Sequence, residues 1–525
     1  MNPVRNRVRA SAPEGPVGRA ISNGVKGCFI LQRRFAYIGH ELAKFLKEKG
    51  AVDEFCGYVQ VRDGYRFLKN QPDIRYTELI LDEEIQKQYK SEKLDTEYLA
   101  KLEDEYGTLW KYINVDRVVR YGQLVREYPH DSSSYTHEEM LRMVQVYAKG
   151  IGAFLDEQKP DFVYGYIFGS LGTLLLYDMA KKRGIPVFTT VVPSTEDLVT
   201  VSQVYDRVTF VERLLKERMH TPLEKIPNYA EARAFLEKFR NRPFVYTKVV
   251  VSREKPGRSG QFSFLKPRKL LWTLYYNLVL TFVEWCRDGE RRRDFTTVNP
   301  FLHLYDLLKR KARNLIGLDD LYDKFDTSKP YTFFPLQYEP EVTLLLWAPE
   351  ESDQVQTVAR IARSLPVGML LYVKEHPGMV PFRPRAFYRR LRKIPNVRLI
   401  NPSISSFDLI KYCALVTVIT GTPGWEAALL QKPVITFGTV YYNALSFIGK
   451  YKTPEDLPEL IKKQLNVTTD DEELLRFIAA LYEDSAALDL MYLWEVETDE
   501  EKRRAGFKRF ADVLALKIRL ISTSN

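Results

Sequence analysis

Apolar residues along this chain form short runs that alternate with longer amphipathic stretches. From Gly27 a short apolar run is followed by an amphipathic stretch over 35–49, which ends at Gly50, and then by a second apolar run over 56–61. This order predicts a strand, a helix and a strand. The same rhythm returns further along, with strands expected at 161–168 and 185–192 and helices at 137–157 and 174–184. Strands that alternate with helices in this way build an α/β layer with a largely parallel sheet.

A second block with this rhythm runs from 331 to 450 and has the clearest pattern in the chain. Its expected strands are 331–337, 368–374, 396–400, 414–420 and 433–438, and its expected helices are 354–365, 386–394, 405–412 and 424–431. Three more helical segments follow, at 454–465, 472–482 and 500–521, and the last could return across the first domain. We therefore predict an α/β fold in which two Rossmann-like domains face each other across a cleft.

The length of 525 residues suits two or three domains of about 150 residues each. The patterns divide the chain into a disordered basic tail, an N-terminal Rossmann-like domain, a basic helical insert, a C-terminal Rossmann-like domain and C-terminal helices, with the expected bounds 1–25, 26–225, 226–330, 331–465 and 466–525.

Composition excludes several classes of protein. Apolar residues make up 45% of the chain and charged residues 28%, so global disorder is excluded. Four cysteines lie far apart without a C-x-x-C pair, which excludes a disulfide framework and a zinc ribbon and favours a reducing compartment. No uncharged apolar run approaches the roughly 20 residues that span a bilayer, and the N-terminus lacks an apolar signal region. We expect a cytoplasmic protein, with peripheral contact to the inner face of the membrane left open.

The segment 253–313 carries most of the excess positive charge. It holds 14 Lys and Arg against 6 Asp and Glu, which is +8 of the chain's formal net charge of +10. At its centre, 270–283 is uncharged but too short to span a bilayer. An interdomain helix with its apolar face turned inward explains this pattern, and so does a helix that lies on an anionic membrane. The chain shows no helix-turn-helix, zinc finger or basic strand face with stacking aromatics, so we expect no nucleic-acid partner.

The first candidate site follows the expected strand that ends at Val373. Lys374, His376 and Pro377 come directly after it, at the carboxyl edge where open α/β sheets bind ligands. Lysine provides a point charge for a phosphate, histidine can donate a hydrogen bond to a phosphate oxygen, and proline fixes the turn. A surface loop with a locally packed histidine would have the same K-x-H-P sequence.

The second candidate site is the turn between the expected strand 414–420 and the next helix. The turn contains Thr420, Gly421, Thr422 and Gly424, and Glu426 lies in the first helical turn. Backbone N–H groups and hydroxyls at a helix N-terminus favour a phosphate, and a carboxylate there could accept hydrogen bonds from sugar hydroxyls. The same carboxylate could instead stabilise the helix dipole. Because both candidate loops follow strands of one predicted sheet, they can share one ligand, and together they favour a nucleotide.

Weaker signals lie elsewhere. Gln337 and Glu339 follow the strand expected at the head of the second domain, where they could contact a ligand or form a hinge. In the first domain the candidates for proton transfer are His40, Asp63, Glu196 and Asp197, and for each of them a surface or capping role is the simpler interpretation.

These motifs resemble the capsular polysaccharide biosynthesis family, whose GT-B-fold relatives include transferases that use CMP-activated Kdo, and they share a His-Pro signature with bacterial polysialyltransferases. The resemblance is carried by PLQ, KEHP and TGTPGWEAALLQKPVI within 331–449 and is weaker over 161–192. It implies that His376 and Pro377 hold the nucleotide phosphate, together with Thr420 and Thr422, and that Glu426 contacts the ribose. It also implies that Gln337 takes the place of a Gln-Pro element.

The resemblance implies a glycosyltransferase that moves a sugar from a CMP- or UDP-activated donor to a glycan or lipid-linked glycan, with no separate cofactor. Lys374 and His376 are the expected catalytic residues, and the remaining site residues are expected to bind the donor. A nucleotide-sugar epimerase or hydrolase and a non-catalytic capsule assembly or export factor are the alternatives. No two aspartates lie two apart, and the cysteines and histidines show no ligand spacing, so we expect no metal.

Overall fold

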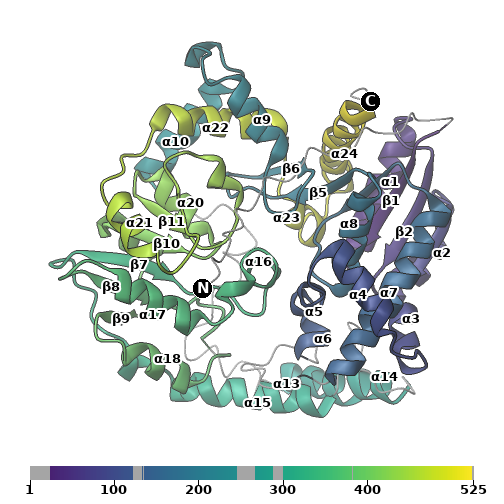
Figure 1. The fold of residues 1–525 in the computed structure, drawn as a ribbon, viewed down its shortest axis with the longest axis horizontal. Helices are drawn as coiled ribbons and strands as arrows, with labels where there is room; N and C mark the ends of the chain where they lie inside the picture. Colours follow the sequence, from purple (N-terminus) through teal and green to yellow (C-terminus); the bar gives the residue numbers. More distant parts are fainter. Residues whose placement is uncertain are drawn as a thin grey trace, which may run out of the picture.

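The computed structural model describes residues 24–121, 133, 135–244, 267–287, 300–380 and 382–522. These residues form two α/β units that lie side by side, each built on one sheet (Figure 1). This confirms the predicted fold class. Within the described ranges, no helix has the length and apolar character needed to cross a membrane.

The first sheet has seven strands in the order β13-β6-β5-β4-β1-β2-β3. Its strands are β1 (Lys26–Leu31), β2 (Glu54–Val59), β3 (Tyr76–Leu81), β4 (Phe162–Gly165), β5 (Val187–Val191), β6 (Leu198–Ser202) and β13 (Ala486–Ala487). Strands β1 to β5 are parallel to one another, and β6 and β13 pair antiparallel. The sequence pattern predicted β1, β2, β4 and β5 but missed β3, β6 and β13.

Helices cover both faces of the first sheet. On one face α1 (Phe35–Glu48) and α24 (Glu500–Ser522) share a core with the strands, and on the other α7 (His137–Gln158) and α8 (Leu171–Lys182) do so. Strands covered on both faces are apolar along their whole length, which explains why continuous apolar runs marked them. The other helices of this part are α2 (Arg62–Lys69), α3 (Asp82–Lys87), α4 (Thr96–Tyr106), α5 (Trp110–Val115) and α6 (Arg117–Tyr121), with the 3-10 turn η1 (Gln88–Lys90).

The second sheet has six parallel strands in the order β12-β11-β10-β7-β8-β9. Its strands are β7 (Tyr331–Pro335), β8 (Leu370–Lys374), β9 (Val397–Ile400), β10 (Leu415–Val418), β11 (Val434–Thr436) and β12 (Gly449–Lys450). One face packs against α17 (Gln354–Ser364), α18 (Arg385–Arg392) and α21 (Leu457–Gln464), and the other against α19 (Ser406–Tyr412), α20 (Thr422–Leu429) and α22 (Asp471–Asp484). Every strand and helix predicted for 331–450 is present, within a few residues at each end.

Two chain crossings connect the units. Helices α9 (Thr209–Glu217) and α10 (Tyr229–Asn241) follow the first sheet in sequence, yet they share a core with the second sheet. In the other direction α24 packs on α1 and β6, where Phe510 and Leu514 are fully buried. The last helix therefore returns across the first unit as predicted. The 3-10 turn η2 (Leu223–Lys225) and helix α23 (Leu490–Glu495) complete these crossings.

The connection between the units runs through a helical border at the bottom of Figure 1. It contains α13 (Pro267–Leu274), the π-helical turn η4 (Tyr275–Leu280), α14 (Thr281–Arg287), α15 (Pro300–Ile316) and the 3-10 turn η5 (Asp319–Leu321). The expected tail 1–25 lies almost entirely outside the described residues.

The carboxyl edges of the two sheets face each other. Gly169, in the loop after β4, touches Val342 in α16 (Val342–Leu345), which follows β7. A Cβ atom on Gly169 would lie 2.3 Å from a Val342 methyl carbon, so only glycine permits this approach. The backbone N–H of Ser194, in the loop after β5, donates to the hydroxyl of Tyr441, which follows β11, at 3.1 Å. Loops that bind ligands in α/β sheets thus lie on both sides of the junction.

Candidate functional site

The strand order of the second sheet fixes where a ligand can lie. If β7 to β12 are numbered 1 to 6 along the chain, their order across the sheet is 3-2-1-4-5-6. The chain therefore continues from β7 toward one edge of the sheet and from β10 toward the other. In open α/β sheets the crevice outside the carboxyl ends of such a strand pair is the usual ligand position. The predicted residues Gln337 and Thr420 follow these two strands, and Lys374 ends the neighbouring strand β8.

The loops after β7 and β10 are joined by side-chain hydrogen bonds. The amide nitrogen of Gln337 donates to the hydroxyls of Thr420 and Thr343, at 3.0 Å each. Thr420 in turn donates to the backbone carbonyl of Thr343 at 3.3 Å. The structure thus brings together two residues that are 83 positions apart in the sequence, and it holds the Thr420 hydroxyl at the crevice.

A hydrogen bond from Tyr442 holds the turn that starts α20. The Tyr442 hydroxyl donates to the carbonyl of Gly421, the N-cap residue, at 2.9 Å. A Cβ atom on Gly424 would lie 2.4 Å from that hydroxyl oxygen, so glycine is required at this position. Thr422 is the first helical residue and is partly exposed. The first N–H groups of α20 therefore lie beside the crevice, where the helix dipole favours an anion.

Lys374 and Glu426 form a buried pair of opposite charges without a direct salt bridge. Lys374 is 7% exposed and donates to the Ser406 hydroxyl at 2.9 Å. Burial lowers the pKa of Lys374 to about 8, against the attraction of the Glu426 carboxylate. Burial also raises the pKa of Glu426 to about 7, against the attraction of Lys374. Both groups therefore titrate near neutral pH, which is typical of functional sites.

His376 is exposed at the rim of the crevice, next to the exposed Pro377. Its Nδ1 accepts the backbone N–H of Gly378 at 3.1 Å. A neutral ring with an accepting Nδ1 carries its proton on Nε2, so this bond prepares Nε2 as a donor. The edge of Tyr338 packs against the ring, with the ring centres 5.3 Å apart.

A buried ion network lies beneath these loops, and sequence reasoning missed its central residue. Arg383 is 1% exposed and donates to both carboxylate oxygens of Glu375 at 2.6 Å. It also lies 2.9 Å from the Glu339 carboxylate and donates to the carbonyl of Gln337 at 2.8 Å. Although burial alone would lower the pKa of Arg383, the carboxylates of Glu375 and Glu339 raise it. The network connects the loops after β7 and β8.

Glu339 takes part in this network rather than standing at its rim. It is 7% exposed, and burial raises its pKa, while Arg383 and the amide of Gln354 counteract the shift. Gln354, at the start of α17, hydrogen-bonds both Glu339 and the backbone N–H of Gln337. The contacts of Glu339 therefore hold the loop that carries Gln337.

The four first-domain candidates occupy separate places. His40 is buried in α1, where its Nδ1 lies 3.2 Å from the Tyr76 hydroxyl. Asp63 is exposed and lies 3.6 Å from Arg66. Glu196 binds Lys238 at 3.0 Å and the Tyr482 hydroxyl at 2.7 Å. Asp197 is partly exposed beside Glu196.

Two arginines mark the carboxyl edge of the first sheet, and sequence reasoning did not single them out. This sheet also has the order 3-2-1-4-5-6 over β1 to β6, and Arg33 follows β1 at its switch point. Burial, with the charges of Arg117 and Arg34, lowers the pKa of Arg33 to about 10. Arg117 starts α6, directly after Asp116, which accepts the N–H of Leu171 at 2.9 Å. The position of Arg33 directly after an apolar strand was the signal that could have found it.

A cavity of about 490 Å³ lies next to the crevice. Its walls come from the loop after β11, from the segment that contains Trp347 and from Arg207 and Glu212 near α9. Gly438 joins it to the site, because a Cβ atom there would lie 2.6 Å from the Thr420 methyl carbon. The cavity is large enough for a sugar.

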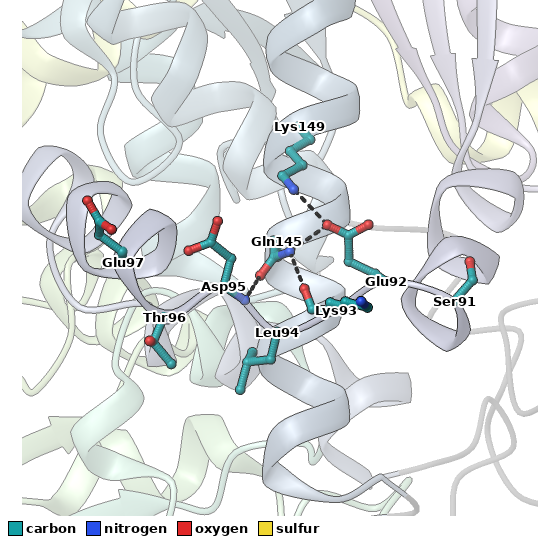
Figure 2. Close-up of a pocket in the computed structure, with 9 residues that line it drawn as sticks. All are labelled: Ser91, Glu92, Lys93, Leu94, Asp95, Thr96, Glu97, Gln145 and Lys149. Atoms are coloured by element: carbon teal, nitrogen blue, oxygen red, sulfur yellow. Dashed lines mark hydrogen bonds and ion pairs between the residues drawn. The ribbon is translucent and has the colours of Figure 1, made fainter.

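A larger hollow of about 770 Å³ lies far from these loops, between the segment 91–97 and helix α7 (Figure 2). Its polar groups already bind each other. Gln145 accepts the N–H of Asp95 at 2.9 Å and donates to the carbonyl of Lys93 at 2.9 Å, and Lys149 lies 2.7 Å from Glu92 (Figure 2). We therefore place the site at the crevice and not at this hollow. Over the described ranges, no group of three or more His, Cys, Asp or Glu could hold a metal ion.

A model of the family described as "Capsule polysaccharide biosynthesis protein" matches residues 302–448 of this chain. The match confirms the resemblance over this range, which contains the whole crevice. It begins inside α15, so it also includes the end of the basic segment, where the sequence motifs gave no resemblance. A comparison with curated proteins found no match.

Several solved structures resemble the chain weakly. The beta Kdo 2,4 transferase of Thermosulfurimonas dismutans KpsC is 15% identical, with 62% of this chain and 80% of that chain covered and a TM-score of 0.34. For its beta Kdo 2,7 transferase the values are 12%, 63%, 80% and 0.33. For UDP-GlcNAc 2-epimerase from Neisseria meningitidis bound to UDP-GlcNAc they are 12%, 88%, 99% and 0.22. These TM-scores lie below 0.5, so the fold assignment rests on the strand orders above.

The ion network predicts a large effect of Arg383→Met. Removing the guanidinium leaves two buried carboxylates without their counter-charge, so we expect the free energy of unfolding to fall by about 3–5 kcal/mol. Arg383→Lys should not restore it, because a single ammonium cannot replace both Nη1, which binds Glu375, and Nη2, which binds Glu339 and the Gln337 carbonyl. Chemical denaturation measures both, with the exposed Arg389→Met on α18 as the matched control. A fall below 1 kcal/mol in Arg383→Met would contradict the role assigned to the network.

Proposed function

We propose that this protein is a glycosyltransferase that moves a sugar from a nucleotide-sugar donor to a surface or capsular polysaccharide or a lipid-linked glycan. The observation that carries the proposal is the convergence of Lys374, His376 and the N-terminus of α20 on the switch point of the second sheet. A lysine, a prepared imidazole donor and a helix N-terminus together suit the phosphate of a nucleotide. The family match over this range supports the same assignment.

The donor contacts follow from this arrangement. Lys374 and the N–H groups of Gly421 and Thr422 hold the phosphate, with His376 Nε2 donating from the rim. Glu426, when ionised, accepts hydrogen bonds from the ribose hydroxyls. Gln337 and Glu339 position the loop after β7 through their bonds to Thr420 and Arg383. The donor nucleotide is CMP, as the resemblance implies, or UDP, and no further cofactor is required.

Catalysis then consists mainly of stabilising the departing nucleotide. The bond between the anomeric carbon and the phosphate oxygen breaks, and the negative charge that develops on that oxygen meets Lys374 and His376. An acceptor hydroxyl forms the new bond to the same carbon and gives its proton to a base on the acceptor side. The acceptor lies at the facing edge of the first sheet, where Arg33 and Arg117 suit an anionic group.

The part of the chain around the first sheet, expected at 26–225, would hold the acceptor, and the part expected at 331–465 would hold the donor. Such a protein would work in the cytoplasm, where nucleotide sugars serve as substrates of this reaction.

A nucleotide-sugar epimerase or hydrolase is the second candidate, and one observation favours it. Glu212, in α9, and Glu350, in the connection between β7 and β8, both line the 490 Å³ cavity. Such an enzyme would act on the sugar with carboxylates and would need no acceptor.

A panel of CMP- and UDP-activated sugars, each with and without glycolipid acceptor, tests the proposal through the release of free nucleotide. A glycosyltransferase releases nucleotide faster when the acceptor is present and yields an extended glycan. Equal release without acceptor would identify the hydrolase or epimerase, and no turnover with any donor would favour a non-catalytic capsule assembly or export factor.

Lys374→Ala and His376→Ala should each lower turnover by about a hundredfold or more, the scale of removing one donor to a developing oxyanion. The thermal midpoint of His376→Ala should change little, because this side chain is exposed. Lys374 is buried beside Glu426, so circular dichroism should verify that Lys374→Ala is folded. Lys393→Ala and His220→Ala, both exposed elsewhere, are the matched controls. Wild-type rates in both site variants would contradict the assignment of this crevice as the active site.

The pKa shifts predict a narrow pH profile of kcat/KM for the donor. Lys374 binds phosphate only when protonated, so the rate should fall above pH about 8, and Glu426 accepts hydroxyls only when ionised, so it should fall below pH about 7. Each limb should approach a tenfold change per pH unit. Glu426→Gln should lose the acidic limb and move the alkaline limb to lower pH, because the carboxylate no longer stabilises the charged lysine. An unchanged acidic limb would assign it to another group.

Turnover should persist in excess EDTA. Lys374, His376 and the helix N-terminus provide the positive charge that a metal would otherwise supply to the departing phosphate. Modest stimulation by magnesium is compatible with this, because the ion can arrive on the nucleotide. A fall to background in EDTA that magnesium or manganese restores would show that the reaction needs a metal.

A further inference from the structure

Helices α13, α14 and α15 present an unusual number of large apolar side chains to solvent. In the first stretch these are Leu271, Trp272, Tyr275, Tyr276, Val279 and Phe282, and in α15 they are Phe301, Leu304, Tyr305, Leu308, Leu315 and Ile316. Leu271 is 67% exposed, Trp272 63% and Leu308 60%. Single exposed apolar residues are normal in folded proteins, but a contiguous set marks an interaction surface.

The exposed residues follow helical spacing, so each stretch has one apolar face. Positions 301, 304, 305 and 308 repeat at three and four residues, and 271, 275 and 279 repeat at four. The two stretches touch where the Phe301 ring lies 6.2 Å from Phe282 and 5.8 Å from Trp285, centre to centre. The two faces therefore belong to one surface, which we call the apolar border.

The exposure of these side chains favours the membrane interpretation of the basic segment. An interdomain helix would have buried the apolar side chains of 271–282 against a domain. Instead the described ones are exposed, and the helices lie along the edge of the molecule beneath both units (Figure 1). The apolar border thus needs a partner outside the two cores.

Charge and residue type identify the chemistry of that partner. The segment 253–313, which contains most of the apolar border, has a net charge of +8, with Arg268 and Lys269 before its apolar centre and Arg287 after it. On α15, Lys309 lies over the Tyr305 ring at 5.2 Å, so charge and aromatic surface are side by side. Tryptophan and tyrosine beside basic residues are typical of helices that lie in the headgroup region of anionic membranes.

We propose that the apolar border docks on an anionic phospholipid membrane, with α13, α14 and α15 parallel to the bilayer plane. The apolar side chains enter the boundary between headgroups and acyl chains, and the basic residues remain among the headgroup phosphates. This inference does not depend on the proposed glycosyl transfer, since no residue of the apolar border lies in the crevice.

The test is sedimentation of the full chain with vesicles of phosphatidylcholine alone and of phosphatidylcholine with phosphatidylglycerol. We expect binding to the anionic vesicles at least tenfold stronger than to the neutral ones, and weaker as salt rises from 0.05 to about 0.5 M because the charges are screened. Equal binding to both kinds of vesicle, or no binding to either, would overturn the proposal.

Variants distinguish vesicle binding through the apolar border from nonspecific binding by other exposed apolar residues. Leu271→Ser, Trp272→Ser and Leu308→Ser combined should weaken binding to anionic vesicles at least tenfold. The matched control replaces three exposed apolar residues elsewhere, Val367→Ser, Tyr412→Ser and Leu516→Ser, and should bind as the wild type does. Equal losses in both triple variants would contradict the proposal. Circular dichroism and the thermal midpoint verify that each variant is folded.

The charge contribution has its own test. Arg291, Arg292 and Arg293 lie outside the described residues, and the sequence predicts that their replacement by Glu abolishes binding to anionic vesicles. Quenching of tryptophan fluorescence by brominated lipid should be strong in the wild type and reduced in Trp272→Phe.

A second copy of this chain is the alternative partner, and self-association can be distinguished from membrane binding. Sedimentation equilibrium without lipid should give a monomer; a dimer that the Leu271→Ser, Trp272→Ser and Leu308→Ser variant dissociates would assign the apolar border to self-association instead. Nucleotide release with a soluble acceptor should be unchanged in this variant, so a failure of membrane binding and a failure of the proposed function give different results.

Discussion

The buried guanidinium of Arg383 is the interaction on which the crevice depends. It lies between Glu375 and Glu339, which belong to loops after two neighbouring strands, so it fixes both loops with one charge. Removing one member would leave another buried charge unpaired, and that cost restricts the loops to one arrangement. Neighbouring residues of an extended chain point to opposite sides. An inward Glu375 therefore directs Lys374 and His376, on either side of it, toward the other face of the loop.

Lys374 and Glu426 show the opposite electrostatic situation. In the Arg383 network hydrogen bonds compensate the burial of charge, whereas Lys374 and Glu426 are buried at a distance that leaves both pKa values displaced toward neutrality. Each charged form is therefore less stable in the free protein than in water. A ligand with a phosphate for the lysine and hydroxyls for the carboxylate would stabilise both charged forms. The hydrogen-bonded charges of the Arg383 network thus lie beneath the crevice, and the destabilised charges of Lys374 and Glu426 lie within it. Displaced pKa values of this kind are typical of binding sites.

Much of the second unit could be predicted from its sequence, because parallel strands covered on both faces are apolar throughout, as in 331–335. The placement of Lys374 and Thr420 followed, since residues directly after such strands share one edge. β3 was missed because Thr77 and Glu78 interrupt its apolar pattern, which leaves it partly exposed. Arg383 could not be predicted, because a local pattern does not tell an arginine that enters the protein from one that faces solvent.

The facing carboxyl edges of the two sheets and the apolar border lie at different places on the molecule. The edges face each other through Gly169 and Val342 beside the candidate site, while the apolar border follows the connection between the units along one side of the molecule (Figure 1). A bilayer beneath the border would touch the connection rather than either sheet. It would therefore leave the Arg383 network and the strand registers unchanged, and would act on where an acceptor approaches. An acceptor anchored in that bilayer would diffuse in two dimensions past the junction of the edges, so docking would raise its local concentration without altering the donor site.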